Sequence, residues 1–146
     1  VTGDGSVMMN LQELQTIVYN NLPIKIIIFN NDGYGAIRTT CKTFFDGTNA
    51  GCDEQSGISF PDFRKISDAF GIDYHCVRNI SELDDGIKWI KDKKNYCILE
   101  IYQMIDDIKG PKVMSKMDEN GVFYTPGLQE MEPSIDKILY DKLMRV

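Results

Sequence analysis

The chain has 146 residues, of which 42% are hydrophobic and 26% are charged, a composition typical of a folded globular protein and too apolar for a disordered one. Its 22 acidic side chains outnumber its 16 basic ones and give a net charge of −6, which argues against nucleic-acid binding because such proteins carry a basic face. No apolar run approaches the roughly 20 residues needed to cross a bilayer, so the sequence predicts no membrane partner.

The first part of the chain alternates between helical and strand-like patterns. Apolar residues at spacings of three and four predict an amphipathic helix over residues 10–20. The apolar run at residues 24–29 predicts a strand covered on both faces, which is typical of a parallel sheet. Residues 30–35 are rich in Asn, Asp and Gly and predict a loop. Residues 38–58 show no clear period, so we expect an irregular excursion there.

The alternation continues through the middle of the chain. A second helix is expected to begin near Pro61 and to end at Gly71, and a third is expected to be capped by Ser81. Apolar segments at residues 74–77 and 96–102 predict two more strands. This order predicts an α/β fold, a doubly wound and mainly parallel sheet with helices on both faces.

The regular alternation stops near residue 105. We therefore expect an α/β domain over residues 1–104 and an irregular C-terminal tail over residues 105–146 that packs on the domain or on a partner subunit. The tail contains three of the five prolines. Within it, residues 118–121 predict the turn of a hairpin, and residues 134–144 predict a short helix.

The cysteines and the single histidine give no metal-binding spacing. No Cys-x-x-Cys pair is present, so a structural zinc site is not predicted. Two disulfides are the alternative, but Cys76 and Cys97 lie in apolar, strand-like segments where reduced buried thiols are common. This usage favours a cytoplasmic location.

A glycine-rich segment near the N-terminus lies between a predicted strand and a helix. Gly3 and Gly5 would let the backbone approach a ligand closely, because neither has a Cβ atom. Ser6 could cap the helix or bond a phosphate oxygen, and Asp4 offers the hard anionic oxygen that suits Mg²⁺.

A second polar loop follows the next predicted strand and should meet the first at the same sheet edge, where open parallel sheets bind ligands. Asn31 offers an amide oxygen there, and the loop offers carbonyl oxygens. Lys25 is the only basic residue between Gly3 and Gly35, so a phosphate would be neutralised by a metal and by backbone dipoles. Either segment alone is most simply a surface turn; the pair is the stronger signal.

The pair resembles the diphosphate-binding signature of thiamine-diphosphate-dependent enzymes. In this sequence 24 residues separate Gly3-Asp4-Gly5 from Asn30-Asn31, which fits that signature. Residues 3–13, 22–25 and 30–38 are similar to the C-terminal, pyrophosphate-binding domain of acetolactate-synthase-like proteins. The resemblance covers nearly the whole chain and implies the thiamine-diphosphate-binding fold, truncated at its N-terminus.

The resemblance also implies roles for individual residues. It makes Asp4, Asn31 and the carbonyl of Gly33 the Mg²⁺ ligands. It places the diphosphate against the remaining residues of the two segments, which are Gly3, Gly5, Ser6, Tyr34 and Gly35. The cofactor, thiamine diphosphate, would act as an electron sink in the decarboxylation of a 2-oxo acid substrate, followed by carboligation or protonation.

The same resemblance implies parts that this sequence does not contain. The activating glutamate of such enzymes lies on a pyrimidine-binding domain, usually of a partner subunit, and no residue here corresponds to it, so we assign no catalytic residue. A middle domain, which binds FAD in some relatives, is also missing, so FAD stays open for the complete protein. We expect a C-terminal piece of a longer homodimer or homotetramer, inactive by itself.

Several alternatives remain open. The complete protein could be a non-catalytic paralogue that binds the cofactor for a structural or regulatory purpose. A nucleotide-binding Rossmann domain is disfavoured, because Met8 occupies the last glycine position of its fingerprint. His75 is expected to be structural, and Arg38 and Lys42 are expected on the surface, with contact to a substrate carboxylate as the alternative.

Overall fold

The computed structural model describes residues 1–105 and 110–144 of the chain. They fall into two compact units, Val1–Asp106 and Asp107–Val146, each of which is described by itself. Within the described residues, no helix is both long and apolar enough to cross a membrane.

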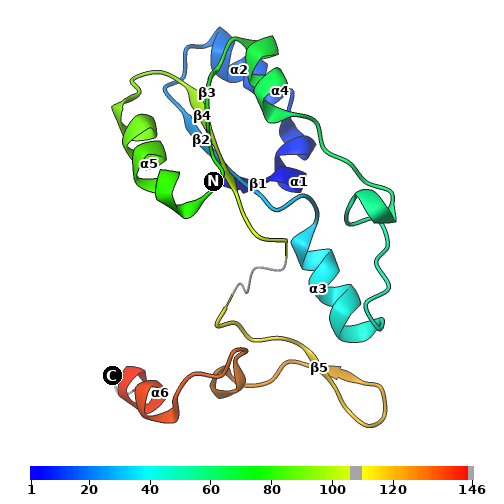
Figure 1. The fold of residues 1–146 in the computed structure, drawn as a ribbon. Coiled ribbons are helices and arrows are strands. Elements are labelled where there is room, and N and C mark those ends of the chain that lie inside the picture. The colour runs from blue at the N-terminus through cyan, green and yellow to red at the C-terminus, as the bar shows by residue number, and fades with distance from the viewer. Residues whose placement is uncertain (106–109, 145–146) are drawn as a thin grey trace. The chain divides into compact units, whose positions relative to one another are not determined.

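The first unit is built on a four-stranded parallel sheet (Figure 1). In spatial order its strands are β1 (Thr2–Gly3), β2 (Lys25–Asn30), β4 (Cys97–Tyr102) and β3 (Asp73–Val77). The strands β2 and β4 are central and rich in Ile and Leu, as expected for strands covered on both faces. Because all four strands are parallel, their carboxyl ends meet at one edge of the sheet.

Helices cover both faces of this sheet, which confirms the α/β fold predicted from the sequence. The helices α2 (Glu13–Tyr19) and α4 (Phe63–Phe70) lie on one face, and α5 (Leu83–Asp92) lies on the other (Figure 1). The first face has a core centred on Leu14, Ile28, Phe63, Ile72 and Ile98. The second has a smaller core of Val77, Ile90, Cys97 and Leu99.

A side-chain cap decides where α4 begins, whereas α5 has no side-chain cap of its own. The Asp62 carboxylate accepts hydrogen bonds from the backbone N–H groups of Arg64 and Lys65 and so starts α4 close to the predicted position. Gly71, at φ +66°, ends that helix as predicted. The predicted Ser81 cap is wrong: Asn79 is the capping residue, and Ser81 lies inside the 3₁₀ turn η3 (Ile80–Glu82) that precedes α5.

The prediction of an irregular excursion over residues 38–58 is wrong in its first part. The helix α3 (Gly35–Phe44) occupies that part, and η2 (Glu54–Ser56) is a short turn within the rest. Threonines obscured the helical pattern, since β-branched residues have low helix propensity. In the structure the hydroxyls of Thr39, Thr40 and Thr43 each donate to the backbone carbonyl four residues earlier in α3.

The helix predicted over residues 10–20 is α2, which begins three residues later and ends one residue earlier than predicted. Residues before α2 form α1 (Asp4–Val7) and the 3₁₀ turn η1 (Met8–Asn10), so the chain turns helically as soon as β1 ends. All four cysteines are free, as the sequence predicted.

The second unit contains a small hairpin and a short helix. The strands β5 (Lys116–Met117) and β6 (Phe123–Tyr124) are antiparallel, and the Asp118 carboxylate accepts from the backbone N–H groups of Asn120 and Val122 in the turn, which confirms the hairpin. A 3₁₀ turn, η4 (Leu128–Glu130), follows. The helix α6 (Lys137–Leu143) begins three residues later than predicted.

Candidate functional site

Asp4 joins the two polar segments at the carboxyl edge of the sheet. It follows β1 directly, as the first residue of α1, and it is only 2% exposed. Its Oδ1 accepts from the backbone N–H of Gly5 at 2.8 Å, and its Oδ2 accepts from the backbone N–H of Gly33 at 2.9 Å. One buried carboxylate therefore fixes the distance between segments that lie 29 positions apart in the sequence.

The loop after β2 turns sharply at two residues with positive φ. Asp32 has a φ of +56°, and its N–H donates to the side-chain oxygen of Asn30 at 2.9 Å. Gly33 has a φ of +150°. A Cβ atom there would lie 2.2 Å from the carbonyl oxygen of Cys52 and 2.4 Å from Nη2 of Arg38. Only glycine fits at this position.

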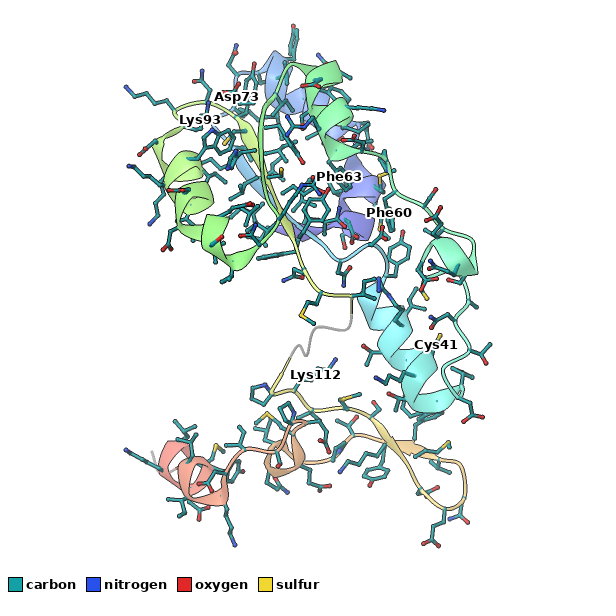
Figure 2. The ribbon with its side chains drawn as sticks, in the orientation of Figure 1. Cys41, Phe60, Phe63, Asp73, Lys93 and Lys112 are labelled. Carbon is teal, nitrogen blue, oxygen red and sulfur yellow. The ribbon has the colours of Figure 1, made fainter. Side chains whose placement is uncertain are left out.

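Tyr34 closes the other side of the junction. Its N–H donates to the Cys52 carbonyl at 2.8 Å, and its ring covers Gly5 so closely that a Cβ on Gly5 would lie 2.3 Å from a ring carbon. Phe60, which is labelled in Figure 2, lies in the segment that precedes α4. Its ring meets the Tyr34 ring edge to face at 5.5 Å between centroids. Three separate segments thus hold the loop in one conformation.

The oxygen atoms at this junction fit a small hard cation. Asn31 is 6% exposed, and its backbone carbonyl accepts from Nη2 of Arg38. Each Asp4 oxygen accepts one protein hydrogen bond, and the Gly33 carbonyl accepts one from Gly35 at 3.1 Å, so all retain lone pairs. Mg²⁺ prefers this kind of ligand set, a carboxylate with neutral oxygens and waters.

The described part of the chain contains no cluster of His, Cys or carboxylate side chains that would bind a metal by itself. No group of three or more His, Cys, Asp or Glu side chains is arranged to hold a metal there. The junction around Asp4 has a single carboxylate, which suits a cation that also takes oxygens from a ligand, as Mg²⁺ does with phosphates.

The cations close to this junction in the sequence are used elsewhere. The Lys25 ammonium donates to the Lys91 carbonyl at 2.9 Å, at the opposite, amino end of β2. Arg38, expected on the surface, is only 7% exposed, and its Nη2 donates to the Asn31 carbonyl at 2.8 Å. Its Nε is buried without a partner among the described residues. Lys42 is exposed, as expected.

Arg38 is thus a residue whose position the sequence analysis misjudged. It lies one turn before Cys41 on α3, and both are buried. The spacing of three residues between Arg38 and Cys41 could have indicated that both lie on the buried face of a helix, but the charge of Arg38 suggested that its side chain faces solvent. The guanidinium donates from Nη2 to the backbone carbonyl of Asn31 and, at 3.5 Å, from Nη1 to that of Ile105, which leaves Nε as its buried donor without a partner among the described residues.

Glu100 is a second residue that the sequence analysis did not single out. It lies in the middle of β4 and is 1% exposed. Its carboxylate accepts from Nδ2 of Asn30 at 2.5 Å and from the Tyr74 hydroxyl. Burial, together with the neighbouring Glu100 carboxylate, raises the pKa of Tyr74 well above its usual value, so the phenol stays protonated and remains a donor. The signal was one charge within an otherwise apolar strand.

His75 has the structural position that was expected, whereas Ser6 does not cap the helix in which it lies. His75 stacks on Trp89 at 5.2 Å between ring centroids, on the α5 side of the sheet and away from the junction. Ser6 is exposed on α1, immediately after the buried Gly5. The remaining predicted site residues lie together at the carboxyl ends of β1 and β2: Gly3, Asp4, Gly5, Asn31, Gly33, Tyr34 and Gly35.

Comparisons with known proteins agree with this geometry. A family model described as "Thiamine pyrophosphate enzyme, C-terminal TPP binding domain" matches residues 1–101. The acetolactate synthase large subunit of Porphyra purpurea is 38% identical over 88 residues, which are 60% of this chain and 15% of that protein. Acetolactate synthase 2, chloroplastic, of Zea mays is 32% identical over 105 residues, 69% of this chain and 16% of that protein.

A solved structure shows the same fold. The Rhodococcus jostii RHA1 thiamine diphosphate-dependent 4-hydroxybenzoylformate decarboxylase superposes with a TM-score of 0.62 at 25% identity. The match covers 71% of this chain and 19% of the decarboxylase. The chain thus spans about 15% of the length of the curated relatives it matches.

Proposed function

The chain belongs to the thiamine pyrophosphate enzymes, as their C-terminal TPP-binding domain, and from this premise we propose that it holds the cofactor's diphosphate through Mg²⁺ in an enzyme acting on 2-oxo acids. The complete protein would be a carboligase or decarboxylase, and its acetolactate synthase relatives support this class. Substrate, partner subunit and cytoplasmic location stay predictions.

The observation that carries the proposal is the junction at Asp4. Its carboxylate accepts from the Gly33 N–H, and Asn31, which is only 6% exposed, lies two residues before Gly33 in the same loop. These features create a set of preorganised oxygens with spare lone pairs. Asp4, Asn31 and the Gly33 carbonyl would hold the metal.

The other residues of the junction shape the space for the diphosphate. Gly3 leaves the backbone open, and Gly5 makes room for the ring of Tyr34, which forms the wall beside it. Ser6 brings an exposed hydroxyl to the same edge. The backbone N–H groups of Tyr34 and Gly35 already donate to the Cys52 and Gly33 carbonyls, so these two residues would line the space for the diphosphate. When bound, the cofactor supplies an electron sink for decarboxylation. The residues of this chain bind and orient it; the activating glutamate would come from another domain, which would leave the isolated chain inactive.

The test is Mg²⁺-dependent binding of thiamine diphosphate by the complete natural protein that carries this chain, measured by calorimetry. Asp4→Ala and Asn31→Ala should each weaken binding by more than about tenfold, because each removes a metal ligand. Asp32→Asn is the matched control: its side chain is exposed, and Asn tolerates the positive φ. Undiminished binding in both test variants would contradict the proposal.

A further inference from the structure

Burying the Glu100 carboxylate in the middle of the sheet costs free energy. In the sheet register Glu100 is paired with Ile28 of β2 on one side and with Cys76 of β3 on the other. A buried carboxylate is tolerated only when its oxygens are hydrogen-bonded. Both oxygens are satisfied by side chains from these neighbouring strands, Asn30 of β2 and Tyr74 of β3.

Asn30 transmits the position of Glu100 to the loop. Its Nδ2 donates to Glu100, while its Oδ1 accepts from the backbone N–H of Asp32 at 2.9 Å. A carboxylate can only accept, so Glu100 obliges the Asn30 amide to face it with the nitrogen. The amide oxygen must then face Asp32. The buried charge thereby selects one of the two orientations of the amide.

The turn held in this way contains two of the proposed metal ligands. Asp32 adopts its positive φ with its N–H bound to Asn30. Asn31 and Gly33 flank Asp32, and the Gly33 N–H reaches Asp4 at 2.9 Å. Without the hydrogen bond from the Asp32 N–H to Asn30, the turn would lose the contact that orients Asn31 and Gly33 on either side of Asp32.

We infer that Glu100 is a positioning residue for the loop at residues 30–35, acting through Asn30 on the site that receives Mg²⁺ and the diphosphate. Glu100 itself is not one of the proposed ligands of Mg²⁺ or of the diphosphate. The inference rests on the proposed function for the identity of the ligand, but the ordering of the loop by Glu100 can be measured without any ligand.

The first experiment compares two truncations at adjacent positions of β4 in the complete protein. Glu100→Ala should weaken binding of thiamine diphosphate with Mg²⁺ by about tenfold or more. Leu99→Ala is the matched control, because Leu99 is fully buried but faces the α5 side of the sheet. It should lower stability and leave affinity within about twofold. Equal weakening by both variants would show a general loss of stability and overturn the inference.

Rescue by a conservative variant separates geometry from charge. In Glu100→Gln the amide oxygen can still accept from Asn30, and the Tyr74 hydroxyl can accept from the amide nitrogen. This variant should keep affinity within about threefold of the natural protein. A loss as large as that of Glu100→Ala would contradict a positioning role that needs only an acceptor.

A double-mutant cycle tests the route through Asn30. Asn30→Ala should weaken binding about as much as Glu100→Ala, and the double variant should be no weaker than either alone. If the affinity losses of the two single variants multiply in the double variant, Glu100 does not act through Asn30. Asn30 is only partly buried, so Asn30→Ala also serves if Glu100→Ala does not fold. Unchanged affinity in Asn30→Ala would then overturn the inference.

Hydrogen exchange of the ligand-free protein makes the test independent of the cofactor. The Asp32 amide should lose protection in Glu100→Ala and in Asn30→Ala, and keep it in Leu99→Ala. A complete protein that binds no thiamine diphosphate would overturn the proposed function, while this exchange would still decide whether Glu100 orders the loop. Equal protection of Asp32 in all variants would refute the ordering itself.

Discussion

At the scale of single residues, the site depends on groups that leave no room for substitution. Asp4 accepts one hydrogen bond at each carboxylate oxygen, from the two segments that it joins. Gly5 lies beneath the Tyr34 ring, and Gly33 lies against the Cys52 carbonyl. Each of these contacts is closer than a Cβ atom would allow. The loop conformation is therefore determined by sterics before any ligand arrives.

Gly33→Ala tests this steric requirement. Its positive φ and the close Cys52 carbonyl should together cost about 1–3 kcal/mol of stability. The displaced carbonyl of residue 33 should lower affinity for thiamine diphosphate with Mg²⁺ by more than about tenfold. Calorimetry and denaturant unfolding of the complete protein measure the two effects.

Gly47→Ala is the control for backbone strain alone. Gly47 has a φ of +74°, and a Cβ atom added there would meet nothing within 4 Å, so only about 1–2 kcal/mol of strain is expected. Its affinity for the cofactor should equal that of the natural protein. A comparable loss of affinity in both variants would show that the contact with Cys52 is irrelevant.

At the scale of elements, the alternation of strands and helices along the chain and the meeting of the two polar segments at one sheet edge were predictable, but the helix α3 and two buried charged residues were not. Strong apolar periods and glycine signals located β2, β4 and the end of α4. The helix α3 was missed because its threonines carry little helical signal and satisfy their hydroxyls only through the helix itself. The burial of Arg38 and the pairing of Glu100 depend on partners 67 and 70 positions away, which no local pattern contains.

The cap of α4 gives a prediction at this scale. Asp62→Ala should reduce the stability of α4 by about 1 kcal/mol, because two backbone N–H groups at the helix start lose their acceptor. Asp68→Ala is the control, an exposed aspartate later in the same helix that caps nothing. Native-state hydrogen exchange of the α4 amides measures both. Equal destabilisation by the two variants would show that the Asp62 cap contributes nothing.

At the scale of the whole molecule, the charge distribution supports the proposed use of a metal. The chain has a net charge of −6. Lys25 is bound to the Lys91 carbonyl at the far end of β2, and the Arg38 guanidinium is bound to backbone carbonyls. Neither side chain is available to neutralise a diphosphate beside the buried Asp4. A divalent cation held by Asp4 and Asn31 would supply that charge.

The requirement for a divalent cation is the central claim, and metal removal tests it most directly. The complete protein, freed of metal with a chelator, is titrated with thiamine diphosphate, and the titration is repeated with Mg²⁺ restored. The account predicts no measurable binding without the metal and full recovery with it. Equal affinity in the presence and absence of a divalent cation would contradict it.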